Sequence, residues 1–219
     1  MEPVSEVEQQ FLRPLNCELN ILSRPDGSAI FNQGNTAVIT AVYGPVEVKV
    51  QKILIDKASV EAIYRPKSGL PCVSDRMRES LLRNTCEIAL VATLHPRTSI
   101  SVIIQELQDS GGLLACAVNA ACLALMNSGI AMKFLVAAVN CMIDQNDEIV
   151  IDPTDKQLKE CKASLTFVFD SVKKNVVASH TTGSFTQVQF QESRLKCQLV
   201  SDKIFSFYRE IVRKYASRI

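Results

Sequence analysis

The central stretch of the chain, residues 94–130, reads LHPRTSISVIIQELQDSGGLLACAVNAACLALMNSGI. Its first half, residues 98–107, is rich in β-branched residues, which favours a strand. Gly111 and Gly112 then form a loop, and residues 113–127 are small and apolar on nearly every side. A segment of that kind predicts a buried helix, and a glycine just past its end is a typical helix stop. The stretch therefore predicts a strand, a tight glycine turn and a central helix.

Short strands are expected before this stretch. Three runs alternate apolar and polar residues and are rich in β-branched side chains, at residues 17–22, 28–32 and 37–43. The turn sequence RPDG and a polar Gln-Gly-Asn connection join them, which predicts an antiparallel meander. The sequence Tyr43-Gly44-Pro45 is expected to end this unit. Two further strands with a polar connection are expected at residues 46–50 and 59–64.

Two amphipathic helices are expected on either side of the central stretch. The first covers residues 74–94, and its expected core face holds Met77, Leu81, Ile88 and Val91. The second covers residues 190–216, and its expected core face runs through Leu195, Leu199, Ile204, Phe207 and Ile211. Each apolar face needs a sheet or a helix to cover it.

Four further strands are expected in the second half of the chain, at residues 135–143, 148–151, 163–170 and 175–179. A short helix is expected between the two pairs, with Asp152 as its N-cap and Pro153 in its first turn. The whole pattern predicts an α+β fold: a single domain at residues 15–219, in which β-sheets with a βαβ crossover pack on helices. Residues 1–14 are expected to form an acidic N-terminal extension.

The composition limits the classes of function. The chain has 219 residues, 47% of them hydrophobic, so it is long enough to bury a core without disulfides. Its 24 Lys and Arg residues nearly balance 23 Asp and Glu residues, which argues against a polycation that binds nucleic acid through net charge alone. The acidic start is neither a secretory signal nor an Arg-rich transit peptide. The longest apolar run is shorter than the roughly 20 residues that a membrane span needs.

The cysteines and histidines predict no metal site. None of the eight cysteines forms a C-x-x-C pair, and several sit in apolar runs, so buried reduced thiols are expected. His95 precedes a proline at a helix end, and His180 lies in an expected polar turn, so both are interpreted as structural or solvated. Five carboxylates are close in sequence and could hold Mg²⁺, but turn and helix-cap roles are favoured for Asp144, Asp147, Glu148, Asp152 and Asp155.

Known enzyme motifs are not found: there is no G-x-S-x-G, Walker loop, G-x-G-x-x-G or H-E-x-x-H. The two glycines before the central helix could present N–H groups to a phosphate, but Leu113 and Leu114 follow them, so a tight turn is favoured. A set of basic residues suggests either a solvated helix face or a local phosphate-contacting patch; it comprises Arg65, Lys67, Arg76, Arg78, Arg83 and Arg97.

Several separated motifs resemble the RNase PH family. They are DGSAIFNQGNT at residues 26–36, AVYGP at residues 41–45 and the whole central stretch. Within that family, further segments are similar to one type of ring subunit of the eukaryotic RNA exosome; they are LSRPDGSA, RPKSGLP, RNTCE and IDPTDKQ. The resemblance extends from about residue 17 to the end of the chain.

The resemblance implies a degenerate active site. Active members of the family use inorganic phosphate to cleave the 3′-terminal nucleotide of RNA. Their phosphate-binding Thr or Ser and Arg correspond here to Leu113 and Leu114, and their two aspartates correspond to Leu158 and Ser164. Their RNA-gripping arginine pair falls near Val73 and Ser74, after a shortened loop. We therefore expect no phosphorolytic activity, no catalytic residue, no bound metal and no cofactor.

The resemblance also implies an assembly. Six RNase PH-like subunits form the exosome ring, cap subunits sit on it, and RNA passes through the central channel to an associated hydrolytic exoribonuclease. A non-catalytic subunit of this ring would serve 3′–5′ RNA processing and degradation, including rRNA processing, in the nucleus, nucleolus and cytoplasm, with no membrane partner. The six basic residues named above are the RNA-binding candidates.

Two alternatives remain open at the level of sequence. One is a nuclease with residual phosphorolytic or metal-dependent hydrolytic activity on RNA or DNA, in which Asp152 and Asp155, with Asp144 or Glu148, would hold the metal. The other is a free homodimeric module that binds RNA or DNA outside the complex.

Overall fold

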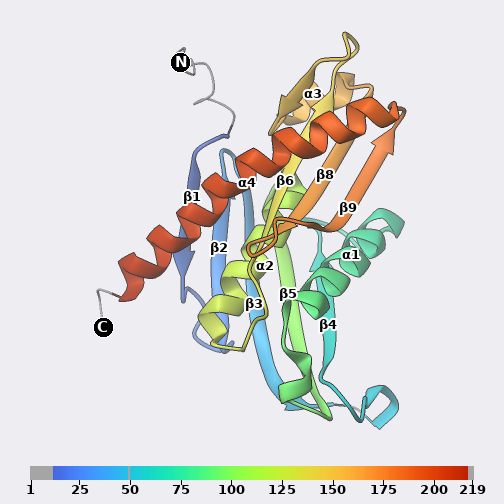
Figure 1. Cartoon of the computed structure of the whole chain (residues 1–219). Coiled ribbons are helices and arrows are strands. Elements are labelled where there is room, and N and C mark those ends of the chain that lie inside the picture. The colour runs from blue at the N-terminus through green and yellow to red at the C-terminus, as the bar shows by residue number, and fades with distance from the viewer. Residues whose placement is uncertain (1–11, 49, 217–219) are drawn as a thin grey trace.

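The first half of the chain forms a five-stranded sheet in a computed structural model that describes residues 12–48 and 50–216. The strand order is β1-β2-β3-β5-β4. The strands span Leu15–Leu19, Gly27–Gln33, Thr36–Glu47, Thr98–Gln108 and Ser59–Arg65, in that spatial order. Three of the four pairings are antiparallel, and β4 pairs with β5 in parallel. Helix α1 (Val73–Ala89) connects these two strands, which confirms the expected βαβ crossover (Figure 1).

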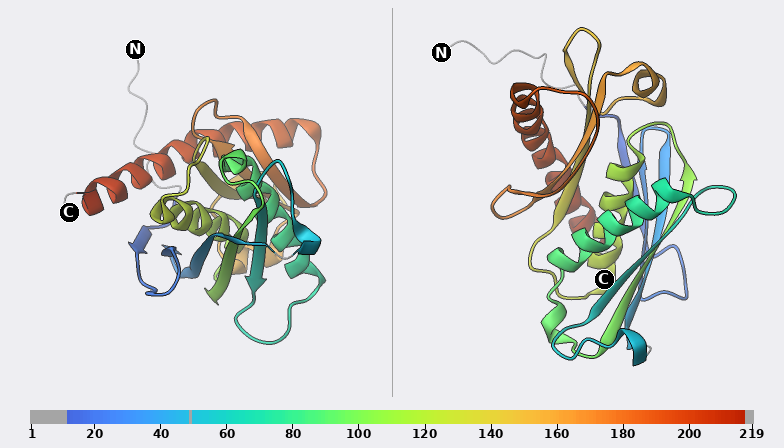
Figure 2. Two further views of the ribbon diagram at one scale, coloured as in Figure 1. Left: turned by 90° about the horizontal axis from the view of Figure 1, so that it is seen from below. Right: turned by 90° about the vertical axis from the view of Figure 1, so that its right-hand side faces the viewer.

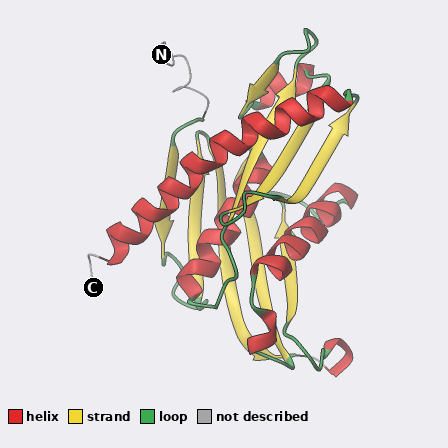
Figure 3. Ribbon diagram, in the orientation of Figure 1, coloured by secondary structure: helices red, strands yellow, loops and turns green. Residues whose placement is uncertain are grey.

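The second half forms a four-stranded antiparallel sheet in the order β7-β6-β8-β9. These strands span Ile149–Ile151, Val136–Ile143, Ala163–Asp170 and Val176–Gly183. A short helix α3 (Asp155–Glu160) joins β7 to β8, and the long helix α4 (Gln187–Ala216) closes the chain. Figure 3 shows the two sheets with α4 running across both. The α+β class is confirmed.

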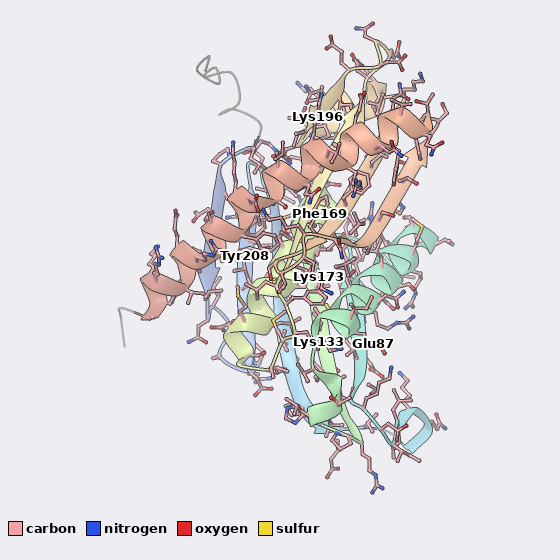
Figure 4. All side chains as sticks on the ribbon, viewed as in Figure 1. Glu87, Lys133, Phe169, Lys173, Lys196 and Tyr208 are labelled. Carbon is pink, nitrogen blue, oxygen red and sulfur yellow. The ribbon has the colours of Figure 1, made fainter. Side chains whose placement is uncertain are left out.

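Helix α2 (Leu113–Ser128) is the centre of the core. It packs on β2 and β3 of one sheet and on β6 of the other (Figures 1 and 2). Its small side chains let both sheets approach closely, and Gly27 on β2 lies so near the backbone of Ala124 that a Cβ would not fit. Its one polar residue in mid-helix, Asn119, is satisfied by the backbone of Ala138 and by the hydroxyl of Tyr208, 3.0 Å away. Tyr208 lies on α4, where Figure 4 labels it. The expected central helix is therefore confirmed.

The first meander continues further than the sequence predicts. Strand β3 passes through Gly44 and Pro45 and pairs again with β5 at Val46, after an irregularity in the register. The N–H of Gly44 donates to the Asp26 carboxylate at 2.8 Å, which supports the backbone where the ladder is interrupted. The prediction of a separate strand at residues 46–50 is wrong. Residues 46 and 47 belong to β3, and residues 50–52 form a 3₁₀ turn; residue 49 lies outside the described residues.

Helix α1 ends earlier than expected and buries another face. Leu90 leaves the helical conformation and forms a bridge with Met132, so residues 92–94 form a separate 3₁₀ turn. The expected core residues Met77 and Ile88 are 48% and 47% exposed. The buried side instead carries the smaller residues of the helix together with one leucine, namely Leu82, Thr85, Cys86 and Ala89.

Helix α4 begins at Gln187, before the expected start, and its core stripe is also shifted. Leu195 and Leu199 are 52% and 72% exposed, contrary to expectation. Ile204 and Ile211 are buried as expected, and the stripe continues through smaller residues that fit against the sheets, namely Ser193, Cys197, Val200 and Ser201. Among the described helices, none is long and apolar enough to cross a membrane.

Two local expectations also fail. The N-cap of α3 is Thr154, which forms a capping box with Gln157; Asp152 is buried two residues earlier with a positive φ of 53°. His180 lies within strand β9 and not in a turn. Six of the eight cysteines are buried free thiols, whereas Cys72 is exposed and Cys161 is half-buried. The expected acidic extension at residues 1–14 falls mostly outside the described residues, which begin at residue 12.

Candidate functional site

A hollow of about 150 Å³ opens where the first turn of α2 meets the second sheet. The central helix supplies its floor, and strands β6, β8 and β9 with helix α3 supply its walls. Its lining contains all four positions at which the family resemblance places degenerate residues, Leu113, Leu114, Leu158 and Ser164. The fold therefore brings these four positions to one hollow, although Leu113 and Ser164 are 51 residues apart in the chain.

The glycine turn shapes the floor of this hollow. Gly111 has a φ of 102°, and a Cβ there would lie 2.5 Å from the carbonyl oxygen of Pro153. Gly112 is the N-cap of α2, also with a positive φ, and it has no side chain to cap the helix. The N–H of Gly111 donates to the carboxylate of Asp109 at 2.9 Å. The turn is thus held by close backbone packing, as the sequence predicts for these two glycines.

An ion pair between Arg13 and Asp152 supports the glycine turn before α2. The guanidinium of Arg13 lies 2.6 Å from Oδ1 of Asp152, and the Arg13 backbone N–H donates to Oδ2 of the same carboxylate at 2.9 Å. The guanidinium also donates to the carbonyl oxygens of Ser110 and Gly111 at 3.1 and 2.9 Å. The Thr36 hydroxyl donates to the Gly111 carbonyl at 2.7 Å. Arg13 therefore links the chain ahead of β1 to both sheets.

The wall on the second sheet is polar and uncharged. Oδ1 of Asn140 accepts hydrogen bonds from the Thr166 hydroxyl at 3.2 Å and from the Ser164 hydroxyl at 3.4 Å. The Asn140 carbonyl accepts the N–H of Asp152 at 2.9 Å, which fixes the chain between β7 and α3. Sequence reasoning missed Arg13, Asn140 and Thr166, because each acts through partners at least 12 residues away in the chain.

One arginine, Arg78, and one histidine, His180, also line the hollow. Arg78 on α1 pairs with Asp75 at 3.0 Å and lies 5.8 Å from the ring centre of Tyr64. Hydrogen bonds from the Cys72 N–H and then from its thiol, together with a smaller effect of the Arg78 charge, hold the pKa of Asp75 below its ordinary value. Burial, with a smaller effect from Arg78, lowers the pKa of His180. His180 is therefore a neutral group at pH 7, and Arg78 is a positioned charge.

The carboxylates considered as metal ligands do not converge. Asp152 is taken by Arg13, and Asp155 pairs with Lys159 on α3 at 2.7 Å. Asp144 and Glu148 close the turn between β6 and β7 through their backbones. Across residues 12–48 and 50–216, no group of three His, Cys, Asp or Glu side chains could hold a metal ion. The capping role expected for Asp152 is wrong, because its carboxylate serves Arg13.

The six basic candidates do not form one patch. Arg65 ends β4, Lys67 follows in the connecting loop, and Arg76 and Arg78 lie in the first turns of α1. Arg83 lies about 10 Å further along this helix, two turns after Arg76. Arg97 precedes β5 at the opposite end of the sheet, roughly 35 Å from the end of that strand. Of the six candidates, Arg78 lines the hollow, and Arg97 lies at the far end of the sheet from the others.

Two family models match the chain and cover most of it. They describe domains 1 and 2 of the 3′ exoribonuclease family, and they match residues 11–131 and 135–193. The chain belongs to this family, the RNase PH family, which confirms the resemblance inferred from the central stretch and the N-terminal motifs.

Within this family, the chain resembles proteins of the Rrp46 type. An Arabidopsis thaliana relative named as an exosome complex exonuclease RRP46 homolog is 42% identical over 166 residues, which is 76% of this chain and 70% of the relative. A relative of the same name from Oryza sativa is 30% identical over 94% of this chain and 93% of its own. The crystal structure of rice Rrp46 superposes with a TM-score of 0.88 at 32% identity, covering 92% and 95% of the two chains.

An archaeal exosome core subunit superposes with a TM-score of 0.79 at 20% identity, over 90% of this chain and 87% of its own. At that identity, the likeness concerns the fold alone. It shows that the two sheets and the buried helix are shared with a chain that forms part of an exosome core.

Proposed function

We propose that the chain is a non-catalytic subunit of the RNA exosome ring. In this role it helps form the channel through which RNA is threaded for 3′–5′ processing and degradation, including rRNA processing. The names of the Rrp46 relatives support the assembly. The observation that carries the loss of activity is the lining of the hollow, where leucines occupy three of the four positions at which the resemblance places the family's phosphate and metal chemistry and Ser164 occupies the fourth.

The chemistry explains why this lining is inactive. Phosphorolysis needs a bound phosphate anion, charge stabilisation of the transition state, and a group that assists proton transfer. Leu113, Leu114 and Leu158 offer neither a donor nor a charge, and Ser164 donates its hydroxyl toward Asn140. The free N–H groups of the first turn of α2 could attract an anion, but Asp109 and Asp155 also line the hollow and oppose it. Arg78 also lines the hollow, but its charge is already paired with Asp75 at 3.0 Å.

The proposed partners are other RNase PH-like ring subunits, cap subunits, RNA in the central channel and an associated hydrolytic exoribonuclease. The proposed locations are the nucleus, the nucleolus and the cytoplasm. The proposed RNA contacts are Arg65, Lys67, Arg76, Arg78 and Arg83, which lie on β4, in the loop after it and on α1, while Arg97 lies at the opposite end of the sheet.

The assembly is tested by purifying the tagged chain from its own cells and weighing the complex by native mass spectrometry. We expect a complex that contains other RNase PH-like subunits in equal amounts. A homodimer or a monomer without them would contradict the ring role.

A second candidate is a nuclease with residual phosphorolytic or metal-dependent hydrolytic activity. The observation that favours it is the word exonuclease in the names of both plant relatives. Asp155, with Asp109 across the hollow, is then the carboxylate pair to test. This candidate predicts that Mg²⁺ or Mn²⁺ supports cleavage of RNA or DNA by the purified chain, and that Asp155→Asn abolishes it.

A further inference from the structure

The loop between β4 and α1 is anchored at both ends. At its start, the Gln105 side chain on β5 donates to the carbonyl oxygen of Pro66 at 3.1 Å. At its end, the N–H of Cys72 donates to the carboxylate of Asp75 at 2.9 Å, which fixes the first turn of α1. The residues between these anchors project beside the start of α1, as the right-hand view of Figure 2 shows.

The middle of this loop is open to solvent. Residues 67–70 are all exposed, and Leu70 is 92% exposed. A Cβ at Gly69 would meet no atom within 4 Å. An enzyme that must enclose several residues of backbone around its target can therefore reach this segment, and Ser68 is the residue in it that carries a hydroxyl group.

Ser68 is the third residue after Arg65 in the sequence RPKSGLP. Among the serines and threonines of residues 12–48 and 50–216, Ser68 alone follows an arginine at this spacing, and Ser206 alone follows a lysine. One class of protein kinases selects this spacing, because carboxylates in the kinase cleft pair with a cation three residues before the acceptor hydroxyl. The charge pattern therefore favours Ser68 as a phosphate acceptor.

The backbone ahead of Ser68 has the extended shape that a kinase cleft binds. Arg65 is the last residue of β4, and the proline that follows it restricts both residues to extended conformations. Three residues of extended chain span about 10 Å. Ser206 lies inside helix α4, where three residues rise only about 4.5 Å, so Lys203 is too close to it along the chain to be selected in the same way.

We propose that Ser68 is a phosphorylation site for a protein kinase that selects arginine three residues before the acceptor. In this reaction the Ser68 hydroxyl oxygen attacks the γ-phosphorus of ATP, the bond from that phosphorus to the oxygen of the departing ADP breaks, and the hydroxyl proton passes to the catalytic aspartate of the kinase. The products are phosphoserine and ADP. The acceptor role is independent of the proposed function, whereas its consequence for RNA rests on that function.

A phosphate on Ser68 changes the charge of the region that is proposed to contact RNA. It adds a charge of about −1.5 to −2 at pH 7. Lys67 is adjacent to it, and the backbone of Arg65 lies at most about 11 Å away along the chain, so both cations are within roughly one Debye length at 0.1 M salt. The phosphate therefore offsets the charge of two proposed RNA contacts, and phosphorylation weakens RNA binding by the ring.

The site is tested by incubating the purified full chain with ATP and a kinase of this class, and mapping the phosphopeptides by mass spectrometry. We expect phosphate on Ser68 and none at this position in Ser68→Ala. Arg65→Gln removes the cation that the kinase selects, so we expect a roughly tenfold slower reaction. Ser206 is the internal control, because it is exposed and follows a cation at the same spacing inside a helix.

The chain purified from its own cells, with phosphatases inhibited, should carry the same phosphopeptide. Three results would overturn the site: phosphate on Ser206 in preference to Ser68, a reaction rate that Arg65→Gln leaves unchanged, or no phosphate on Ser68 in cells.

The effect on RNA is measured with rings reconstituted from the phosphorylated chain. Loss of two phosphate contacts lowers the salt slope by about 1.4 and the affinity for single-stranded RNA by roughly 25-fold at about 0.1 M salt. The matched control is the Ser68→Ala ring treated with the same kinase, which should bind normally. Equal binding by the two rings would overturn the effect on RNA. If Arg65→Gln with Lys67→Gln also leaves RNA binding by the untreated ring unchanged, the proposed RNA contacts fail while the phosphorylation site stands.

Discussion

Arg13 and Asp152 form a buried ion pair at 2.6 Å, although 139 residues separate them in the chain. The Asp152 side chain is 1% exposed, and the same guanidinium donates to two carbonyl oxygens of the glycine turn. The pair therefore fastens the N-terminal end of the first sheet, the turn before α2 and the start of α3 to one another.

Arg13→Ala should destabilise the chain strongly. It leaves a carboxylate buried without a counter-charge, which costs about 3–5 kcal/mol. Urea unfolding followed by circular dichroism measures the loss. The control is Asp155→Ala, which removes an exposed pair with Lys159 and should therefore change stability little. Equal effects of the two variants would mean that the buried pair has no special role.

Gly111→Ala should be far more damaging than Gly129→Ala. A Cβ at Gly111 meets the Pro153 carbonyl oxygen at 2.5 Å, whereas one at Gly129 meets nothing within 4 Å, and both residues have a positive φ. Strain alone costs about 1–3 kcal/mol at each site, and the steric clash adds to it only at Gly111. The midpoints of denaturant unfolding compare them directly. A similar loss at both positions would contradict the close packing of the turn.

Stability should fall as the pH drops through the range of an ordinary histidine. Burial and Arg78 lower the pKa of His180 in the folded state, so the unfolded state binds a proton first as the pH falls below about 6.5. The stability is complete above that pH, and it is lost between 6.5 and the lower folded pKa. His180→Gln removes this titration. We expect the wild type to lose more free energy of unfolding between pH 7.5 and 5.5 than His180→Gln, and equal losses would refute the assignment.

The basic residues of α1 should matter for RNA binding, and Arg97 at the other end of the sheet should not. Arg76→Gln with Arg83→Gln removes two exposed cations from one side of α1 in the assembled ring. Each phosphate contact with single-stranded RNA contributes about 0.7 to the salt slope of the binding constant, so two contribute about 1.4. Filter binding over a salt series measures that slope. Arg97→Gln is the control, and a salt slope that changes only in the control would place RNA at the other end of the sheet.

The pattern of apolar and polar residues along the sequence predicts the elements whose structure depends on residues close in the chain. Strand β5 and helix α2 match the expected residues almost to their ends, because their periodicity and the glycine turn are encoded within one stretch. The core faces of α1 and α4 were mispredicted where small residues, such as Cys86 and Cys197, let a helix approach a sheet more closely than leucines would.

At the hollow, too, sequence predicts what depends on nearby residues and misses what depends on distant ones. The four degenerate positions were identified by family resemblance, yet only the fold brings Leu113 and Ser164 to one hollow. Asp152 was expected to cap a helix because its local sequence favours that role, and its distant partner Arg13 overrides the local preference. Neither Arg13 nor Asn140 carries a local signal, because their bonds join segments far apart in sequence.

Nucleoside diphosphate release by the purified chain alone tests its non-catalytic role directly. A 3′-tailed RNA is incubated with the chain, with and without inorganic phosphate, and an active RNase PH enzyme serves as the positive control. The leucine-lined hollow predicts no shortening of the RNA and no diphosphate under either condition. Release of nucleoside diphosphates that disappears when phosphate is omitted would contradict the non-catalytic role.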